Sequence, residues 1–422
     1  MLYERWRESA GACPDRIALR DAADGSAWTF GELLTLSEKP GSKRQPIVFP
    51  QEPSPEFIFT VLRAWRKRQV TCPLEPGQAA PPITGPLPPD VVHLKSTSAT
   101  TGASRLVAFT AAQLMADAEN IVATMGLKPD WPNLGVVSLA HSYGFSNLVL
   151  PLLLHRIPLI LAGSALPEAV RRAAALEPAI TLAGVPALWS RWHEAEAIPA
   201  NVRLAISAGA LLPLRLEQSI FAKSGLKIHN FYGSSECGGI AYDSSSEPRL
   251  DGSCAGAPLR NVQVAINPSG CLEVRGPAVG QTYWPEPSPN LREGVFRTTD
   301  LAEIAGGLVY LRGRASDQIN VAGRKISPEV IEEALSGHPC VRECVAFGAP
   351  STDAERGEMI VACLAEKEKV GADVLKQYLM TKLPAWQVPR EWCFVKSLVG
   401  NNRGKLSRAE LRRRYLERVL DA

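Results

Sequence analysis

Residues 296–333 read FRTTDLAEIAGGLVYLRGRASDQINVAGRKISPEVIEE, and this stretch determines how the rest of the chain is organised. Its middle part, GLVYLRG at 307–313, is a short apolar run bounded by glycines, which predicts a buried strand. A helix is expected to begin further on, because Ser327 is a good N-cap and Pro328 suits the first helical position. We therefore expect one structural unit to end and another to begin within this stretch.

Two residues of opposite charge stand at the ends of the expected strand pair, Asp300 and Arg314. The sequence around them, TTDL at 298–301 and GRASDQINVAGRKISPEVIE at 313–332, resembles the domain junction of the adenylate-forming superfamily. That superfamily includes acyl-CoA synthetases, aryl-acid ligases and nonribosomal adenylation domains. The resemblance implies that Asp300 binds both ribose hydroxyls of a nucleotide. It also implies that Arg314 is a catalytic residue that reaches the ribose or the phosphates.

The resemblance implies a fold and a division into domains. The expected fold is α/β, with a large N-terminal domain over residues 1–314 that contains mostly parallel sheets, helices and a small β-subdomain. A small, mobile α+β domain over residues 317–422 would follow a hinge near residues 315–316. From residue 134 the chain alternates apolar strands with helices, which by itself favours a parallel sheet covered on both faces.

The bulk composition is that of an ordinary soluble globular protein. The chain has 422 residues, 45% of them hydrophobic, and a net charge of +3 that is too small to indicate nucleic-acid binding. Nine cysteines without C-x-x-C spacing predict reduced thiols and a cytoplasmic location. The uncharged stretch 131–154 holds Asn, His, Gly and Pro, so we expect a buried core segment and no membrane span.

Two segments are shorter than the resemblance leads us to expect, residues 37–53 and residues 76–90. The family normally has additional βα units in the second of these places. The chain is therefore expected to be a compact member whose first subdomain is reduced. A second copy of the chain is one candidate to cover a sheet face exposed in this way.

The segment VVHLKSTSATTGASR at 91–105 is the first chemical motif. A loop of small hydroxyl residues presents backbone N–H groups and hydroxyls to phosphate oxygens, although composition alone would favour an ordinary polar loop. The resemblance to the family's phosphate loop favours phosphate binding, with Ala99, Ser104 and Arg105 as departures from the pattern. The residues that it implies for ATP binding are Thr97, Ser98, Thr100, Thr101, Gly102 and Arg105.

The segment LKIHNFYGSSECGGIAY at 226–242 resembles the family motif Y-G-x-T-E. There the Tyr packs on adenine, the hydroxyl meets a phosphate, and the Glu is a catalytic residue that binds Mg²⁺, a metal that takes few protein ligands. A solvated loop acid is the alternative for Glu236. The two glycines that follow would line the acyl pocket and give space or flexibility there. The residues implied by this motif are Tyr232, Gly233, Ser235, Glu236, Gly238 and Gly239.

Two weaker matches complete the large domain. The segment RLAISAGALL at 203–212 resembles a family strand end, which implies that Gly209 and Ala210 lie against adenine and that Ser207 lines the acyl pocket. His141, in AHSYG, has two interpretations. It is either a core histidine with satisfied hydrogen bonds or a gate near the carboxylate tunnel.

The C-terminal segment NNRGKLSRAEL at 401–411 resembles the family motif around its catalytic lysine, which implies that role for Lys405. A Walker A loop is the competing interpretation. It fails because the glycine spacing is one residue short and because too little chain follows for a P-loop domain. The resemblance also implies that Gly323 approaches a pantetheine thiol after the small domain rotates.

These motifs together imply activation of an aryl or fatty acid by Mg-ATP to acyl-AMP, followed by transfer to CoA or to the phosphopantetheine of an acyl carrier protein. Arginines between residues 403 and 418 would attract CoA phosphates or an acidic carrier protein, or form a solvated helix face. A different class of function also stays open. The reduced first subdomain, Ala99 and Ser316 are compatible with a catalytically weak nucleotide-binding scaffold or regulator.

Overall fold

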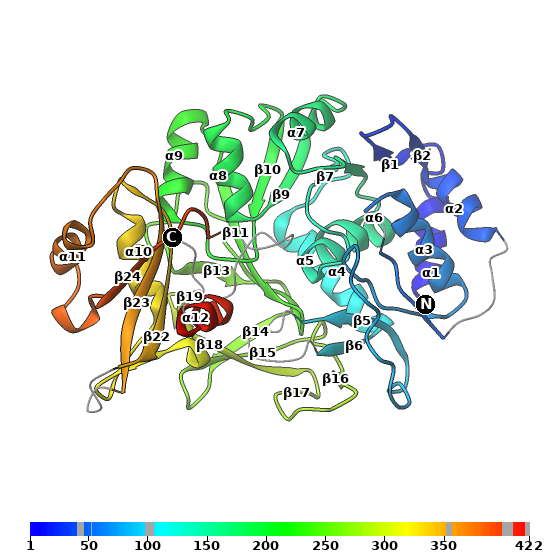
Figure 1. The fold of residues 1–422 in the computed structure, drawn as a ribbon. Coiled ribbons are helices and arrows are strands. Elements are labelled where there is room, and N and C mark those ends of the chain that lie inside the picture. Colours follow the sequence, from blue (N-terminus) through cyan, green and yellow to red (C-terminus); the bar gives the residue numbers. More distant parts are fainter. Residues whose placement is uncertain (40–45, 52, 98–104, 352–356, 399–407, 418–422) are drawn as a thin grey trace.

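The computed structural model describes residues 1–39, 46–51, 53–97, 105–351, 357–398 and 408–417 (Figure 1). Its largest sheet has 14 strands and changes character along its length. Six neighbouring strands are parallel, as the alternating sequence pattern predicted. In spatial order they are β11 (Ile228–Ser234), β10 (Val202–Ser207), β9 (Ile180–Gly184), β7 (Asn133–Gly135), β8 (Leu159–Leu161) and β1 (Ile17–Asp21), with β2 (Ala27–Thr29) antiparallel at the edge.

Helices cover both faces of this parallel part. Side chains of a strand alternate between faces, so Ala205 packs with the helices on one side and Ile206 with those on the other. The first side carries α7 (Pro167–Ala174), α8 (Pro186–Glu194) and α9 (Leu214–Ser224), which lie along the top of Figure 1. The second side carries α4 (Ala111–Met125). The predicted α/β fold is confirmed, and the expected parallel arrangement holds for this part of the sheet.

The sheet continues into an antiparallel part that corresponds to the expected small β-subdomain. Its strands are β12 (Gly238–Tyr242), β13 (Cys254–Pro258), β14 (Gln263–Ile266), β15 (Cys271–Arg275), β17 (Leu291–Arg292), β18 (Val295–Ala305) and β19 (Leu308–Arg314). The strand predicted over 307–313 is β19. It pairs with β18 so that Asp300 and Arg314 are direct partners across the ladder. The spacing of the two residues in the sequence thus brings them side by side.

A second sheet of five strands carries the start of the chain's phosphate-loop motif. Its order is β16 (Thr282–Trp284), β6 (Leu106–Thr110), β5 (Val91–Ser96), β4 (Val70–Thr71) and β3 (Ile47–Val48). The last two strands have only two residues each, in the region that the sequence suggested is reduced. Three helices lie at this end of the molecule, namely α1 (Leu2–Gly11), α2 (Phe30–Glu38) and α3 (Pro55–Arg66) (Figure 1).

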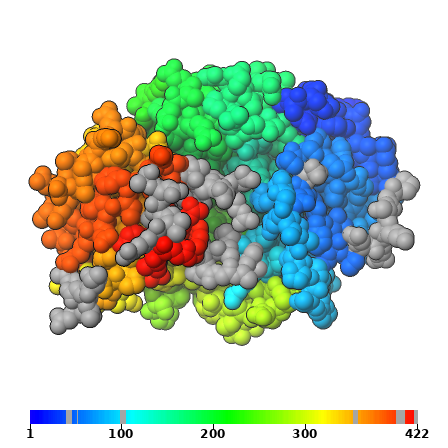
Figure 2. Space-filling view, viewed as in Figure 1, coloured from blue at the N-terminus to red at the C-terminus, as the bar shows by residue number. Residues whose placement is uncertain are grey.

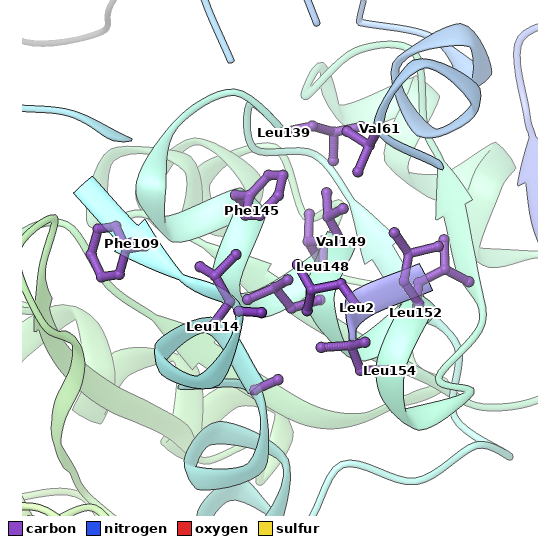
Figure 3. Close-up of a cluster of buried hydrophobic side chains, with 14 of the residues drawn as sticks. Leu2, Val61, Phe109, Leu114, Leu139, Phe145, Leu148, Val149, Leu152 and Leu154 are labelled. Atoms are coloured by element: carbon purple, nitrogen blue, oxygen red, sulfur yellow. The ribbon is translucent and has the colours of Figure 1, made fainter. Parts of the chain in front are cut away.

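The stretch 131–154, predicted to be a buried core segment, contains α5 (Ser142–Gly144), the π-helical turn η1 (Phe145–Val149) and α6 (Leu150–His155). Its apolar side chains pack with those of α1, α3 and α4. Figure 3 shows Phe145, Leu148 and Val149 among Leu2, Val61 and Leu114. In the described part of the chain, no helix combines the length and apolar character that crossing a membrane requires.

The last part of the chain, drawn from yellow through orange to red in Figure 2, contains a three-stranded sheet of its own. It contains β20 (Ile319–Val321), β21 (Arg324–Ile326), α10 (Pro328–Ser336), β22 (Val341–Pro350), β23 (Glu358–Glu366), α11 (Ala372–Met380), β24 (Glu391–Phe394) and α12 (Arg408–Leu416). Ser327 precedes α10 as predicted. Its hydroxyl does not cap the helix, because it donates to the carbonyl of Arg312 over 2.6 Å and so ties α10 to β19.

Candidate active site

The side chains of Tyr232 and Arg314, from two different strands, both contact the carboxylate of Asp300 on a third strand. The Tyr232 hydroxyl, at the end of β11, donates to Asp300 Oδ2 over 2.5 Å. Arg314 Nε, from β19, donates to Asp300 Oδ1 over 3.0 Å. Burial, reinforced by the charge of Asp300, raises the pKa of Tyr232 well above its usual 10.0, so the phenol stays protonated and keeps donating. The carboxylate is thereby fixed from two sides, and its other lone pairs can accept from a diol.

A second group forms around Glu236. The Tyr283 hydroxyl donates to Glu236 Oε1 over 2.9 Å, and the Arg105 guanidinium lies 5.3 Å from the centre of the Tyr283 ring. Burial and the charge of Glu236 raise the pKa of Tyr283. Ser235 reaches the same region, because its hydroxyl donates to the carbonyl of Ser96 at 3.5 Å. The segment after β11 therefore lies against the hairpin of β5 and β6.

The two ends of the predicted phosphate loop are held together. Thr97 N donates to the Arg105 carbonyl over 2.8 Å, and Arg105 N donates to Thr97 Oγ1 over 3.2 Å. Ser98, Thr100, Thr101 and Gly102 lie outside the described residues, as does Lys405. The structure thus brings Thr97, Arg105, Ser235 and Glu236 together and leaves the roles of the other loop residues as predictions.

The donors around Glu236 fit a magnesium ion that is held mainly by a nucleotide. Within the described ranges, no cluster of three or more His, Cys, Asp and Glu side chains could bind a metal by itself. A single carboxylate suits Mg²⁺, which usually keeps water and substrate phosphates as its remaining ligands. Glu236 beside the phosphate-loop hairpin provides such a carboxylate.

The predicted adenine-binding residues follow the carboxyl end of β10. Gly209 has φ +82°, a conformation that favours glycine, and Ala210 comes next. The carboxyl end of β10 lies beside β11, since Ser207 and Asn230 are partners in the parallel ladder. Ligands of parallel α/β sheets bind at such carboxyl ends. Gly233 is constrained as well, because a Cβ there would lie 2.5 Å from the carbonyl oxygen of Gly238.

Ser207 itself is fully buried, and its hydroxyl has no hydrogen-bond partner among the described residues. The alternation of β10 places its side chain on the face of Ala205, beneath α8 and α9. His141 is exposed and caps α5, with Nδ1 accepting from Tyr143 N over 3.2 Å. It is therefore not a core residue, and its gating role stays a prediction, as does the place of Ser207 in the acyl pocket.

The Cβ directions of Gly238 and Gly239 do not face open space, and their place in the acyl pocket stays a prediction. A Cβ on Gly238 would collide with the Asp117 carboxylate, and one on Gly239 would collide with Leu259 and lie 2.9 Å from the Phe231 ring. The two glycines are needed because side chains from elsewhere in the chain fill the space beside them.

The side chain next to Gly238 belongs to a buried polar cluster that we did not predict. Lys95, Asp117 and Ser146 contact one another there. The sequence signal was present, because Lys95 interrupts an apolar strand and Asp117 lies on the apolar side of α4. Lys95 precedes the phosphate loop itself, and Asp117 belongs to none of the motifs.

Gly323 lies in the turn between β20 and β21 with φ +80°. A Cβ there would meet nothing within 4 Å, so its surroundings in this structure are open. The turn η2 (Ala315–Asp317) follows β19 directly, at the predicted hinge. Arg408, three residues after Lys405, binds Asp317 at 2.5 Å, Glu332 at 2.9 Å and Glu329 at 3.0 Å. Segments near both the expected hinge and the expected catalytic lysine are thus linked to each other.

The buried side chain of His93 is expected to make the stability of the protein depend on pH. Burial and the nearby Lys95 charge lower the pKa of His93 well below its usual 6.5. His93 therefore binds a proton near pH 6.5 in the unfolded chain but stays neutral at that pH in the folded chain. The free energy of unfolding consequently falls as the pH drops below 6.5. We expect the free energy of unfolding to fall by up to about 1.4 kcal/mol per pH unit for this residue.

Urea unfolding at pH 7.5, 6.5 and 5.5 measures this effect. Burial also lowers the pKa values of His155 and His229, so part of the slope should survive in His93→Gln. His193→Gln, at a half-buried histidine on α8, is the control for replacing a histidine by glutamine. An equal slope in His93→Gln and in the wild-type protein would contradict the prediction.

The chain is similar to known proteins over most of its length. The AMP-binding enzyme family model matches residues 36–284, more than half of the chain, and the model of the AMP-binding enzyme C-terminal domain matches residues 330–405. A feruloyl-CoA synthase of an Amycolatopsis species is 29% identical over 389 residues, which cover 86% of this chain and 78% of that protein. A probable 2-succinylbenzoate–CoA ligase of Mycobacterium tuberculosis is 28% identical over 352 residues, 77% of this chain and 85% of that protein.

Solved structures share the whole fold. ATP-bound MatB from Rhodopseudomonas palustris superposes with a TM-score of 0.85 at 20% identity and covers 99% of this chain and 100% of that one. The o-succinylbenzoate CoA synthetase MenE from Bacillus subtilis, in complex with the acyl-adenylate OSB-AMP, gives a TM-score of 0.80 at 21% identity, with 96% and 97% covered. The chain belongs to the AMP-binding enzyme family and is an adenylate-forming acid–thiol ligase.

Proposed function

We propose that this enzyme activates a carboxylic acid with Mg-ATP and then transfers the acyl group to the thiol of CoA. The observation that carries the proposal is the Tyr232–Asp300–Arg314 arrangement, which offers a fixed carboxylate to a ribose diol at the edge of a parallel sheet. Relatives named as CoA ligases and a similar structure solved with an acyl-adenylate support the order of the two steps.

In the first step, a substrate carboxylate oxygen attacks the α-phosphorus of ATP. The bond to the bridging oxygen breaks, and pyrophosphate leaves with the electron pair. The protein contributes positioning and charge compensation, because phosphoryl chemistry of this type needs little covalent help. Lys405 would contact the carboxylate and the α-phosphate, while Arg105 and the loop after Thr97 would hold the leaving pyrophosphate. A magnesium ion on Glu236 would neutralise phosphate charge when bound.

In the second step, the CoA thiolate attacks the acyl carbon, and AMP leaves with the electrons of the mixed anhydride bond. We assign residues 1–314 and 317–422 to two domains that rotate about residues 315–316 between the steps. The rotation would remove Lys405 and bring Gly323 toward the thiol. The open surroundings of Gly323 fit a backbone that a ligand approaches closely.

The basic tail gives little reason to prefer a carrier protein over CoA. Arg413 pairs with Glu410 at 2.8 Å and with Glu417 at 2.5 Å, and Arg414 pairs with Glu410 at 2.8 Å. Arg412 Nε donates to the carbonyl of Gly348 over 2.8 Å. These arginines are engaged within their own domain, which fits a solvated helix face.

Carboxylate-dependent exchange of pyrophosphate into ATP tests the first step, and thioester formation with CoA tests the second. We expect both with the full chain and Mg²⁺. A parallel assay with a phosphopantetheinylated carrier protein separates the two acceptors. Nucleotide binding without exchange for any acid would reject the proposal in favour of a scaffold or regulator.

The ribose contact makes a specific prediction. Asp300→Asn replaces one acceptor oxygen by an amide and removes the charge that faces Arg314. A hydrogen bond to a charged group contributes about 1.5–3 kcal/mol, so kcat/KM for ATP should fall roughly 10- to 150-fold. Glu303→Gln is the matched control, because Glu303 is an exposed carboxylate on the same strand that pairs with Arg312 at 3.0 Å. Equal ATP kinetics in the two variants would remove Asp300 from the nucleotide site.

A further inference from the structure

Three side chains from separate elements form a closed polar cluster beneath the site. Lys95 Nζ, on β5, donates to Asp117 Oδ2 over 3.3 Å and to Ser146 Oγ over 3.0 Å. Ser146, in the π-helical turn η1, donates to the same Asp117 oxygen over 2.6 Å. The Lys95 side chain is 2% exposed and that of Asp117 is 1% exposed. We call Lys95, Asp117 and Ser146 the buried cluster.

The buried cluster lies directly against the segment that follows Glu236. Asp117 Oδ1 accepts from the backbone N–H of Gly239 over 3.3 Å. The Asp117 carboxylate also occupies the position where a side chain at residue 238 would place its Cβ, so only glycine fits there. Leu259 and Phe231 fill the space on the other side, against Gly239. Asp117 of the ion pair and two apolar side chains therefore occupy the space beside Gly238 and Gly239.

An aromatic ring lies against the amino group of Lys95 in the buried cluster. Lys95 Nζ lies 4.6 Å from the centre of the Phe109 ring, and the Phe145 ring stacks on His93 at 4.2 Å. Figure 3 shows Phe109 and Phe145 on either side of Leu114. A buried charge that loses its partner in such surroundings is strongly destabilised, and a hydrocarbon chain offers neither charge a hydrogen bond. The hydrocarbon chain of a substrate would therefore gain no free energy by displacing the buried cluster. In this respect the cluster differs from a wall of flexible apolar side chains.

We infer that the substrate is a compact carboxylic acid, either a short aliphatic acid or an acid with one aromatic ring, and that long-chain fatty acids are excluded by the Lys95–Asp117 pair. The inference rests on the proposed function and on the assignment of Gly238 and Gly239 to the acyl pocket. It narrows the aryl-or-fatty-acid alternative that the sequence leaves open.

A panel of acids tests the inference on the wild-type enzyme. Pyrophosphate exchange is measured with acetate, butyrate, hexanoate, octanoate, dodecanoate and hexadecanoate, and with benzoate and cinnamate. We expect the highest kcat/KM with an acid of up to six carbons in a chain or with a single ring, and a value at least about 100-fold lower for dodecanoate, since the last few methylenes have no site. If dodecanoate or hexadecanoate is the best substrate, the inference is wrong while the proposed function stands. If no acid supports exchange, the proposed function fails and this inference fails with it.

A double variant tests the role of the charges themselves. Lys95→Leu/Asp117→Ala removes both charges at once, so neither is left unpaired, and opens apolar space beside Gly238. We expect the ratio of kcat/KM for octanoate to that for butyrate to rise at least tenfold. Glu119→Ala, on the exposed side of the same helix, should leave the ratio unchanged. An unchanged ratio in a folded double variant overturns the inference, and if the variant does not fold, the wild-type panel decides.

Discussion

Replacing Lys405 with alanine is expected to lower the rate of acyl-adenylate formation roughly 10²- to 10³-fold, which corresponds to about 3–4 kcal/mol of lost transition-state stabilisation. Negative charge develops on the α-phosphate and the bridging oxygen as the carboxylate attacks. An ammonium group between the two reactants stabilises this charge without reorganising water. Pyrophosphate exchange with a saturating acid measures the loss.

The second half-reaction separates this role from a structural one. In the proposed cycle, Lys405 leaves the site before the thiol attacks, so the variant should form thioester from synthetic acyl-AMP and CoA at close to the wild-type rate. Lys376→Ala, an exposed lysine on α11 in the same last part of the chain, is the control and should leave both steps unchanged. Near-wild-type exchange in Lys405→Ala would show that the motif resemblance assigns the wrong residue.

The meeting of Tyr232, Asp300 and Arg314 could be predicted from the sequence because these residues are close to turns and strand ends with strong local signals. The apolar run at 307–313 and the glycines around it predicted β19, and the pairing of β18 with β19 brings Asp300 to Arg314. Tyr232 reaches Asp300 from a distant part of the chain, yet it stands at a strand end that its own motif marks.

The packing around Gly238 and Gly239 could not be predicted in the same way. Two glycines in a row indicate a close approach, but the sequence does not say whether a ligand or another side chain fills the space. Asp117 is 121 positions before Gly238 (238 − 117), and nothing local to either residue indicates that they meet. A charged residue within an apolar helix face predicts a buried partner, and only the packing of α4 against β5 and η1 shows that the partners are Lys95 and Ser146.

The tail arginines illustrate a third limit. Their number was compatible with attraction for CoA phosphates or an acidic carrier protein, and with a solvated helix face. The structure shows internal pairs. The number of arginines therefore does not tell which of their charges can still bind a partner, because that depends on the ion pairs within α12.

A second buried charge network leads to the largest expected effect on stability. Glu217, in the first turn of α9, is completely buried and binds Lys227 through one oxygen and Arg249 Nε through the other, the latter over 2.8 Å. Lys227 also pairs with Asp243 at 2.5 Å. Arg249 continues the network, because its guanidinium donates to the carbonyls of Leu212 and Cys254. The network therefore connects α9 and β11 to the segment that follows Gly209 and Ala210.

Glu217→Ala should lower the free energy of unfolding by about 3–5 kcal/mol, because it leaves two buried cations without the carboxylate between them. Glu177→Ala is the matched control. Glu177 pairs with Arg20 at 3.2 Å, but the two side chains are 23% and 32% exposed, so water replaces the lost partner and the expected cost is about 0–1 kcal/mol. Urea unfolding of both variants measures the difference.

Since Arg249 holds the carbonyl of Leu212, Glu217→Ala should also raise the KM for ATP where the protein stays folded, whereas Glu177→Ala should not. Equal losses of stability in the two variants would mean that water reaches Lys227 and Arg249, and that burial of this network does not hold the adenine side of the site in place.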